Sequence, residues 1–263
     1  MHAPALPPIP SELLLLAYRN GIFPMADSRD DPEVFWVEPK ERAIIPLDGF
    51  HMSRSLRKAV ARDRFTVTCN TAFDAVMDAC AAPRPGHPES WISRRIVASY
   101  RALHAIGHAH SIECWQDGEL VGGLYGVSFD KVFCGESMFS RADNASKVAL
   151  AWLVALLRHA GYELLDCQFM TEHLASLGAV PLEQADYCAL VAQARGEPRC
   201  SLGEAYSAFA GAAAAEGDAL GVGAGDAVAV AAREGAAVEL APEEGTGASC
   251  PGKLIAQSLT HTS

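Results

Sequence analysis

The sequence predicts an α+β protein with a small N-terminal domain, a larger mixed-sheet domain and an Ala/Gly-rich C-terminal extension. Helix and strand patterns alternate from residue 69 onward, which is typical of a mixed sheet flanked by helices. The chain ahead of this region has short strand patterns of its own, and the composition changes abruptly near residue 200. We therefore expect domains at 1–68 and 69–200, followed by the extension 201–263.

The N-terminal region carries two helix patterns and two short strand patterns. Ser11 is the expected N-cap of a first helix, which Gly21 ends. Short strands are expected at 34–37 and 43–46, on either side of a turn at Pro39. Ser53 is the expected cap of a second helix. That helix carries five basic side chains, called the basic strip below: Arg54, Arg57, Lys58, Arg62 and Arg64.

The charge distribution limits the classes of function. The formal net charge is −11, which argues against a protein that coats DNA, because phosphate binding needs cationic surface. Residues 201–263 contribute −6 of this charge, with two basic and eight acidic residues. Residues 40–67 hold seven basic and three acidic residues, a local charge of +4. A solvated helix face and a small phosphate-contacting patch both remain open for the basic strip.

Regular elements follow one another between residues 69 and 168. Ser93 is the expected cap of one helix, and Asp143 or Asn144 that of the longest, which Gly161 ends. The residues 116–118, Gln-Asp-Gly, predict a hairpin between two apolar runs. Helices are expected at 71–81, 93–106 and 144–160. Strands are expected at 110–115, 119–128, 132–138 and 162–168.

The extension has an unusual composition. Of the fifty residues 201–250, seventeen are Ala and nine are Gly, so few large side chains can offset the entropy of ordering. We expect a flexible or loosely packed segment, with Val228 and Val230 as candidates for a short strand.

Cysteine usage and apolar runs indicate the compartment. The eight cysteines are spread singly with no CxxC pair, which disfavours a metal ribbon or a redox dithiol and fits a reducing cytoplasm. No run of 18 apolar residues is present, and no basic segment precedes the short apolar run 13–16. We therefore expect neither a membrane-spanning helix nor a signal peptide.

Polar residues interrupt two otherwise apolar strand patterns. Glu136 lies within 132–139, and Asp166 and Gln168 end the pattern that begins at 162. Alternation along a strand places Asp166 and Gln168 on one face, and Leu165 and Cys167 on the other. A buried carboxylate needs a partner or a place beside a cleft. Catalysis and a structural hydrogen-bond network are both compatible with this pattern.

Other candidate motifs point to weaker alternatives. His104, His108 and His110 with Glu113 suggest a metal site, but no third ligand has diagnostic spacing, and structural imidazoles are the favoured interpretation. Cys134 lies in an apolar strand and, like Cys167, is expected to be an inert core thiol. The glycines within 122–126 lack the lysine of a phosphate loop and are expected to allow close backbone approach.

A family resemblance runs through most of residues 11–192. The first motifs that carry it are Ala17-Tyr18-x-x-Gly21-x-Phe23-Pro24-Met25, Trp36-x-x-Pro39-x-x-Arg42, Ser90-Trp91-Ile92 and Gly107-His108-Ala109-His110-Ser111-Ile112-Glu113-x-Trp115. The later motifs are Leu120-Val121-Gly122-Gly123-Leu124-Tyr125-Gly126-Val127, Gly135-Glu136-Ser137-Met138-Phe139-Ser140, Asn144-x-Ser146-Lys147, Asp166-Cys167-Gln168, His173-Leu174 and Ser176-Leu177-Gly178-Ala179. In these motifs the chain resembles the leucyl/phenylalanyl-tRNA–protein transferases.

The resemblance implies a cytoplasmic enzyme of the N-degron pathway. Such an enzyme moves Leu or Phe from aminoacyl-tRNA to the N-terminal Arg or Lys of a protein and marks that protein for degradation. It uses no metal or nucleotide cofactor. Its larger domain resembles the acetyltransferase (GNAT) fold.

The resemblance also implies roles for particular residues. Asp166 acts through Gln168 on the incoming α-amino group, either as a base or by orienting the amine, and Glu136 is the third polar group of that site. Leu124, Met138 and Leu165 match positions that line a pocket for the Leu or Phe side chain. Trp36 and Trp91 stack on the terminal adenosine of the tRNA or frame the substrate, and core packing is the alternative for both. The basic strip contacts phosphates of the tRNA.

The chain departs from the family pattern at two positions, and two other functions compete with the one that the resemblance implies. Asp130 stands where similar proteins commonly have Gly, and Gln184 where they commonly have Arg, so a tRNA contact or a structural contact is in doubt at Gln184. An acyl-CoA-dependent acetyltransferase is disfavoured because 140–144 is not a Gly-rich pyrophosphate loop. A catalytically silent tRNA- or degron-binding module is disfavoured because Glu136, Asp166 and Gln168 are all present.

Overall fold

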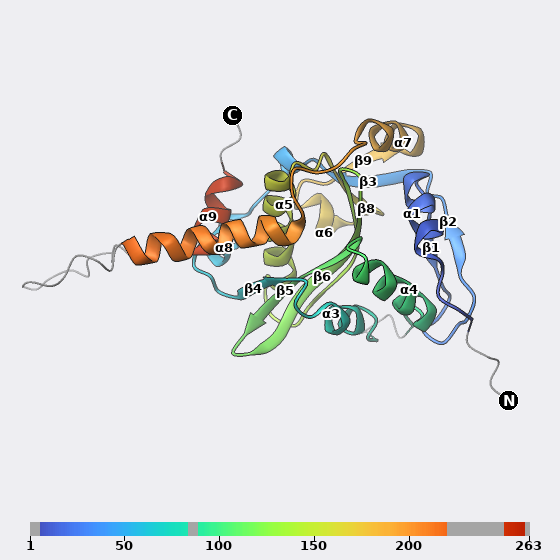
Figure 1. Cartoon of the computed structure of the whole chain (residues 1–263), viewed down its shortest axis with the longest axis horizontal. Coiled ribbons are helices and arrows are strands. Elements are labelled where there is room, and N and C mark those ends of the chain that lie inside the picture. Colours follow the sequence, from blue (N-terminus) through green and yellow to red (C-terminus); the bar gives the residue numbers. More distant parts are fainter. Residues whose placement is uncertain (1–5, 84–88, 220–249, 261–263) are drawn as a thin grey trace, which may run out of the picture.

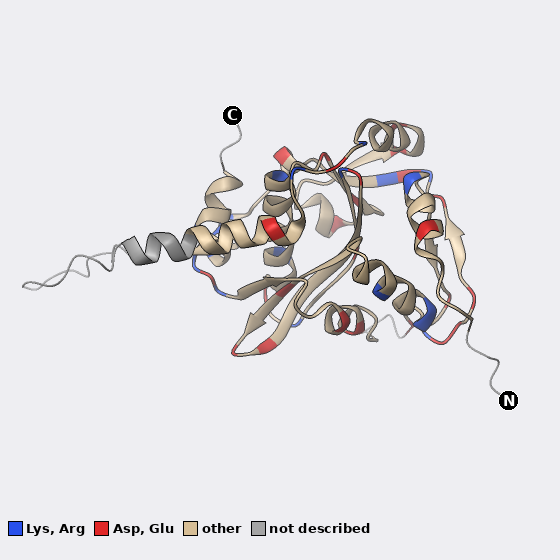
Figure 2. Cartoon of the chain, in the orientation of Figure 1, with Lys and Arg blue, Asp and Glu red and all other residues tan. Residues whose placement is uncertain are grey.

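A central mixed sheet with helices on both faces organises the molecule (Figure 1). The computed structural model describes residues 6–83, 89–219 and 250–260. The sheet has seven strands in the order β4-β5-β6-β7-β8-β3-β9, and a separate sheet pairs β1 with β2. The charged residues lie mainly on helices and loops around the large sheet rather than along its central strands (Figure 2).

The first part of the chain supplies a helix, the small sheet and one strand of the large sheet. Its elements are α1 (Ser11–Arg19), β1 (Phe23–Met25), β2 (Phe35–Val37), β3 (Glu41–Ile45), a 3-10 turn at Leu47–Gly49 and α2 (Arg54–Ala61). Strand β3 lies antiparallel to β8 on one side and to β9 on the other. The large sheet therefore includes a strand from the predicted N-terminal domain, and a division at residue 68 separates β3 from its partners.

The middle of the chain forms most of the large sheet. Its elements are β4 (Thr66–Cys69), α3 (Phe73–Cys80), α4 (Arg94–Ala105), β5 (Ala109–Gln116), β6 (Glu119–Phe129), β7 (Val132–Ser140), α5 (Ala145–Ala160) and β8 (Leu164–Gln168). Strands β4 to β7 form an antiparallel meander. Helix α5 then crosses over, so that β8 pairs parallel to β7. Apart from β4, which was not predicted, these elements agree with the predicted ones to within a few residues.

The C-terminal part completes the sheet and returns to the body of the molecule. Its elements are α6 (Glu172–Ala175), β9 (Val180–Glu183), α7 (Gln184–Gln193), α8 (Leu202–Ala219) and α9 (Pro251–Ser258). Helix α8 runs outward from the body (Figure 1). No helix in the described ranges is long and apolar enough to cross a membrane.

Two apolar cores lie on the two faces of the sheet, because side chains alternate along each strand. Leu124 of β6 belongs to the core beneath α5, together with Leu153 and Leu165. The next residue, Tyr125, belongs to the opposite core beneath α3 and α4, together with Tyr100. Helix α1 packs on α4 within that second core.

Local sequence signals decide most of the element ends. Ser53 and Ser93 accept hydrogen bonds from the backbone N–H groups of Leu56 and Ile96, as predicted for N-caps. The hairpin turn at Asp117 and Gly118 has positive φ at both residues, which matches its sequence.

Two predicted helix caps differ from the structure. Helix α1 begins at Ser11 itself, and its side chain makes no capping bond, because Pro10 occupies the cap position. Asn144, with φ of 68°, precedes α5 but likewise makes no side-chain capping bond.

Gly122 allows a close contact between the sheet and α5. A Cβ atom at this position would lie 2.5 Å from the Cβ of Ala145. The prediction of close backbone approach for the glycines of this strand is therefore confirmed at Gly122.

The extension is more ordered at both ends than its composition predicts. Leu202 and Ala205 of α8 are buried in the core beneath α5, and the hydroxyl of Tyr206 donates to the carbonyl oxygen of Val67. Ile255 of α9 is also buried in that core. The prediction of a loosely packed segment is thus wrong for the start of α8, where a few large side chains reach the core. The strand suggested at 228–230 lies outside the described residues.

Candidate active site

Glu136 projects from a β-bulge in the central sheet. In the β6–β7 ladder Gly126 faces Gly135 and Tyr125 faces Ser137, which leaves Glu136 as an extra residue without a partner. A bulge re-aims a side chain and interrupts the ladder, and bulges occur often beside active sites. The side chain of Glu136 is buried, so its carboxyl group needs hydrogen-bond partners.

Three polar side chains from α1, α4 and β8 surround the Glu136 carboxyl group. The hydroxyl oxygen of Tyr18 lies 2.7 Å from Oε1, and that of Tyr100 lies 3.1 Å from Oε2. The two tyrosine hydroxyls also contact each other. The Nε2 atom of Gln168 donates to Oε1 over 2.8 Å. The three polar residues of the predicted site therefore do not stand alone, because two tyrosines complete the arrangement.

Burial dominates the protonation of this cluster. It raises the pKa of Glu136 to about 7; the hydrogen bonds from Tyr18, Gln168 and Tyr100 oppose the rise, and the negative charge of Asp166 adds to it. Burial also raises the pKa values of Tyr18 and Tyr100 well above the ordinary value of a tyrosine. The tyrosine hydroxyls therefore stay protonated, while Glu136 can exchange a proton near neutral pH.

Gln168 ends β8 in an unusual backbone conformation. Its φ is 64°, in the left-handed region that residues with a side chain seldom adopt. Its backbone N–H donates to Oδ1 of Asp166 over 2.9 Å, which holds the turn, while its side chain reaches Glu136. Within the described parts of the chain no hydrogen-bond partner is found for the amide oxygen of Gln168. Strained residues of this kind cluster at functional sites.

Asp166 lies in a closed ion pair with Arg42. The side chain of Arg42 is 1% exposed and that of Asp166 is 0% exposed. The Arg42 guanidinium donates to both carboxylate oxygens of Asp166 and to the carbonyl oxygen of Gly21, and it lies over the rings of Phe23 and Tyr187. Burial alone would lower the pKa of Arg42, but the attraction of Asp166 reverses the effect and raises it. The pair is thus fully enclosed.

An apolar pocket opens beside Glu136 on the face of the sheet that α5 covers. Its volume is about 210 Å³. The three predicted pocket residues, Leu124, Met138 and Leu165, all line it, and so does Cys167. The pocket does not include Asp166 or Gln168, so the predicted two faces of this strand are confirmed. The remaining lining residues are Tyr125, Gly135, Glu136, Ser137, Leu150, Leu153, Thr171, His173 and Leu174.

The two predicted tryptophans each contact the chain at or directly after β1, and not the apolar pocket. Trp36 of β2 pairs with Pro24 of β1 and is 40% exposed. The carbonyl oxygen of Trp91 accepts the backbone N–H of Ala26, the residue directly after β1. Both therefore lie at one strand, and neither lines the pocket beside Glu136.

The basic strip lies on α2 and the turn after it. All five of its side chains are exposed, and none forms an ion pair with a carboxylate in the part of the chain that the structure describes. The apolar side of α2 packs against α9. Arg42, which the local charge count of 40–67 includes, is buried on Asp166 and adds nothing to this surface.

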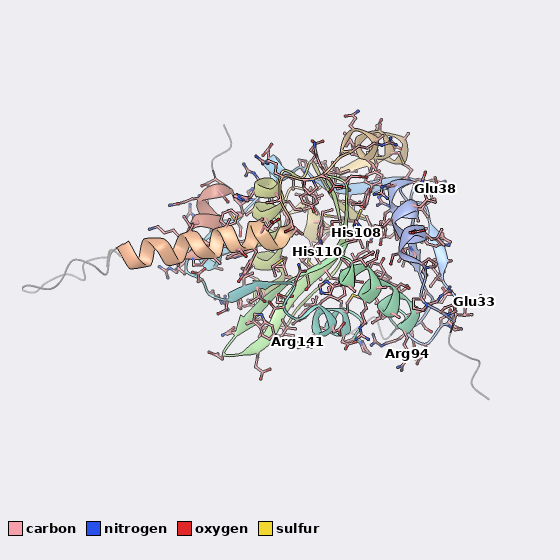
Figure 3. The ribbon with its side chains drawn as sticks, viewed as in Figure 1. Glu33, Glu38, Arg94, His108, His110 and Arg141 are labelled. Carbon is pink, nitrogen blue, oxygen red and sulfur yellow. The ribbon has the colours of Figure 1, made fainter. Side chains whose placement is uncertain are left out.

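The histidines make structural contacts. His108 and His110, labelled in Figure 3, bond to the carbonyl oxygen and the hydroxyl of Ser128, respectively. Glu113 accepts hydrogen bonds from the hydroxyls of Thr68 and Ser111. No group of three or more His, Cys, Asp and Glu residues that could hold a metal ion is found in the described ranges.

Four residues of the buried network were not predicted as site residues: Tyr18, Arg42, Tyr100 and Tyr187. Arg42 had a local signal, because it stands directly before the apolar run 43–45. Tyr18 stands in one of the family motifs, but Tyr100 and Tyr187 had no signal, because a tyrosine on the apolar side of a helix is ordinarily a core residue.

The two departures from the family pattern are accommodated locally. Asp130 has a φ of 50° in the turn after β6, the conformation that glycine favours, and it pairs with Arg19 over 3.0 Å. The amide Nε2 of Gln184 donates to the carbonyl oxygen of Gly21, which also accepts from Arg42. Gln184 thus makes one structural contact, at Gly21, while its buried Oε1 has no hydrogen-bond partner among the described residues.

In comparisons with known proteins, two family models match successive parts of the chain. The family model described as "Leucyl/phenylalanyl-tRNA protein transferase" matches residues 44–192, and that of the N-terminal domain of the same family matches residues 9–40. A protein of Novosphingobium aromaticivorans named "Leucyl/phenylalanyl-tRNA--protein transferase" is 65% identical over 97% of both chains. A protein of Zymomonas mobilis with the same name is 59% identical over 68% of this chain and 67% of its own length. Among solved structures, "The structure of L-PGS from Bacillus licheniformis" matches with 16% identity and a TM-score of 0.34, over 63% of this chain and 55% of that one.

Proposed function

Because the chain belongs to the leucyl/phenylalanyl-tRNA protein transferase family, we propose that it transfers Leu or Phe from aminoacyl-tRNA to the α-amino group of an acceptor protein that begins with Arg or Lys. This reaction would mark the acceptor for degradation in the cytoplasm. One observation carries the proposal beyond the family: an apolar pocket opens directly beside the Glu136–Gln168 pair.

The pocket has the size and polarity for an amino-acid side chain. Its volume of about 210 Å³ is smaller than the roughly 300–1,000 Å³ typical of pockets for drug-sized ligands. Leu and Phe carry no polar group that would need a partner there. Met138 adds adaptability, since its unbranched side chain can accommodate two shapes. We therefore assign Leu124, Met138 and Leu165 to binding of the transferred side chain.

The transfer reaction depends more on positioning the α-amine beside the aminoacyl ester than on activating either group. The neutral α-amine attacks the carbonyl carbon of the aminoacyl ester, the C–N bond forms and the bond to the ribose oxygen breaks. The proton lost by the amine balances the proton gained by the ribose hydroxyl, so no further reactant is required. The ordinary pKa of an α-amino group is about 7.7–8.0, so a useful fraction is neutral near neutral pH. Fixing this amine next to the ester supplies much of the rate.

Gln168 is the group suited to hold the amine. Its amide nitrogen is engaged by Glu136, which leaves the amide oxygen to accept an N–H of the incoming amine. Asp166 is enclosed by Arg42 and by the backbone N–H of Gln168. We therefore propose that Asp166 acts as a positioning residue that fixes the turn at Gln168, rather than as a base in contact with the amine.

The remaining assignments concern the tRNA. Trp36 and Trp91 lie at one strand of the small sheet, and Trp36 is exposed enough to stack on a terminal adenosine. The exposed basic strip, which forms no ion pair with a described carboxylate, suits phosphate contacts, because these position a nucleic acid without reading its sequence. We propose these as the sites for the acceptor end and the backbone of the tRNA.

The fold and domain assignments extend in the same way. We propose that the larger domain has the acetyltransferase-like fold, on the basis of the antiparallel meander β4–β7 followed by a parallel strand pair. We also propose a domain boundary at 38–40, directly before β3, in place of 68, because all of β3 pairs within the large sheet. The Ala/Gly-rich extension would then contribute α8 and α9 to the larger domain.

A transfer assay tests the proposed function. The protein is incubated with Leu-tRNA carrying labelled Leu and with a peptide beginning with Arg. We expect label in the peptide, and none when the α-amino group is acetylated. Absence of transfer while a known transferase is active in the same mixture contradicts the proposal.

A pair of variants tests the role of Gln168. Replacing Gln168 by Ala should lower kcat strongly and leave the KM for Leu-tRNA almost unchanged. Gln193→Ala, at the exposed end of α7, is the matched control. An equal effect of the two substitutions would remove Gln168 from the mechanism.

A further inference from the structure

The Glu136 carboxyl group and two tyrosine hydroxyls form a closed triangle of contacts. Oε1 of Glu136 meets the Tyr18 hydroxyl, the Tyr18 hydroxyl meets that of Tyr100, and the Tyr100 hydroxyl meets Oε2. All three side chains are buried, from 0% exposed for Tyr100 to 7% for Glu136. The two tyrosine hydroxyls are therefore closed to solvent, and Glu136 is nearly so although it also borders the apolar pocket. The contacts within the triangle are thus satisfied by its own protons.

The number of available protons distinguishes the two charge states of Glu136. Each of the three oxygen–oxygen contacts needs one proton to be a hydrogen bond. An ionised Glu136 leaves two protons, one on each tyrosine, so one contact would bring two lone pairs together. A protonated Glu136 supplies the third: Oε2–H donates to Tyr100, Tyr100 donates to Tyr18, and Tyr18 donates to Oε1. Every contact is then a hydrogen bond, in a ring that runs in one direction.

We infer that Glu136 is neutral in the active form of the enzyme and positions the amide of Gln168 as an uncharged hydrogen-bonding residue. This inference rests on the proposed function and deepens it. In this state Oε1 is a carbonyl oxygen that accepts from both Tyr18 and Nε2 of Gln168. Glu136 is thus a positioning residue that acts through Gln168, and it takes no proton from the amine.

A neutral Glu136 changes the charge balance of the site in a way that favours the reaction. With Glu136 neutral, the charged group that contacts Gln168 among the described residues is Asp166, and its charge is cancelled by Arg42 in a closed pair. An uncharged site favours the neutral, nucleophilic α-amine over its ammonium form. An ionised Glu136 would do the opposite and hold the amine as an unreactive cation.

The surroundings of Glu136 agree with this assignment. The pKa of Glu136 is raised to about 7 by burial, despite the opposing hydrogen bonds. The titratable groups that face it come from α1, α4, β6, β7 and β8, and Asp166 is the one acid among them: Tyr18, Tyr100, Tyr125, Cys134 and Asp166. No cation among these groups stabilises an ionised Glu136 directly.

The pH dependence of Glu136→Gln tests the inference. A glutamine amide reproduces the neutral acid, because its NH₂ donates towards Tyr100 and its carbonyl oxygen accepts from Tyr18. In the wild type, kcat/KM should rise with pH as the amine loses its proton and then fall as Glu136 ionises. The fall should be absent in E136Q. Above the pKa of Glu136, kcat/KM of E136Q divided by that of the wild type should therefore increase about tenfold for each pH unit. Glu136→Ala, which opens the triangle, should lower activity at every pH.

The controls separate this inference from the proposed function. Glu163→Gln removes an exposed carboxylate that pairs with Lys131 and should leave the wild-type profile in place. A folded E136Q without activity at any pH, beside an active wild type, would overturn the inference, because it would mean that the charged form is needed. If the wild type itself transfers nothing, the proposed function fails instead. Infrared spectroscopy still decides the protonation in that case, since a carboxylic acid C=O band at pH 6 must disappear in E136Q, and its absence from the wild type overturns the inference.

Discussion

Replacing Arg42 by Met should destabilise the protein far more than the loss of one surface charge. Methionine keeps an unbranched apolar side chain at this position and removes the guanidinium that lies over the rings of Phe23 and Tyr187, so the loss chiefly measures the charged group. Arg42 and Asp166 are almost completely buried, and Asp166 would be left without its counter-ion. Breaking a buried ion pair in this way costs about 3–5 kcal/mol, because the remaining charge stays desolvated. We expect a loss of this size in the free energy of unfolding.

Urea denaturation followed by circular dichroism measures this loss. Arg94→Met is the matched control, since the pair of Arg94 with Asp30 is 78% exposed on both sides and should contribute nothing resolvable. The double variant Arg42→Met with Asp166→Leu removes both charges and should recover part of the stability. The reasoning fails if Arg42→Met unfolds at the same urea concentration as Arg94→Met, or if the double variant loses as much as the two single variants together.

Four other predictions concern the buried acid, the pocket, the basic strip and the C-terminal helix. The folded-state pKa of Glu136 is raised to about 7. The resulting contribution to the free energy of unfolding, about 3 kcal/mol, is fully present below pH 4.5 and is lost as the pH rises through 7. The urea midpoint of the wild type should fall over this pH range, and that of E136Q should not. Leu124→Trp should fill the apolar pocket and raise the KM for Leu-tRNA at least about tenfold in steady-state assays, with unchanged binding of uncharged tRNA. Changing Arg57 and Lys58 to Gln should weaken tRNA binding and reduce the slope of log affinity against log salt by about 1 for each charge in filter-binding titrations. Ile255→Ala should lower the free energy of unfolding by about 2–5 kcal/mol, and a loss too small to resolve in urea titrations would mean that α9 is not docked.

Local signals allowed most elements to be predicted. A turn such as Asp117-Gly118 fixes its own backbone conformation, and Ser53 or Ser93 satisfies N–H groups only three residues away. The alternation that places Leu165 and Asp166 on opposite faces also depends only on neighbours in the chain. The same signals brought Glu136 and Gln168 into one candidate site, because both break apolar strands.

The rest of the site depends on contacts between distant parts of the chain. The bulge at Glu136 is a property of the ladder between two strands, so the sequence of one strand does not reveal it. Tyr18 and Glu136 are 118 residues apart, and Arg42 and Asp166 are 124 apart. The position of β3 between β8 and β9 is non-local in the same way, which is why the boundary expected at 68 crosses the sheet.

The place of β3 in the sheet also bears on the order in which the protein folds. Its two partner strands come more than a hundred residues later in the chain, so β3 cannot pair until they have been synthesised. Pairings with such large sequence separation form slowly, because the chain must first close a long loop. The same event brings Arg42 onto Asp166 and the carbonyl oxygen of Gly21. A chain in which β3 has not yet paired therefore lacks the counter-ion of Asp166, the residue that holds the turn at Gln168.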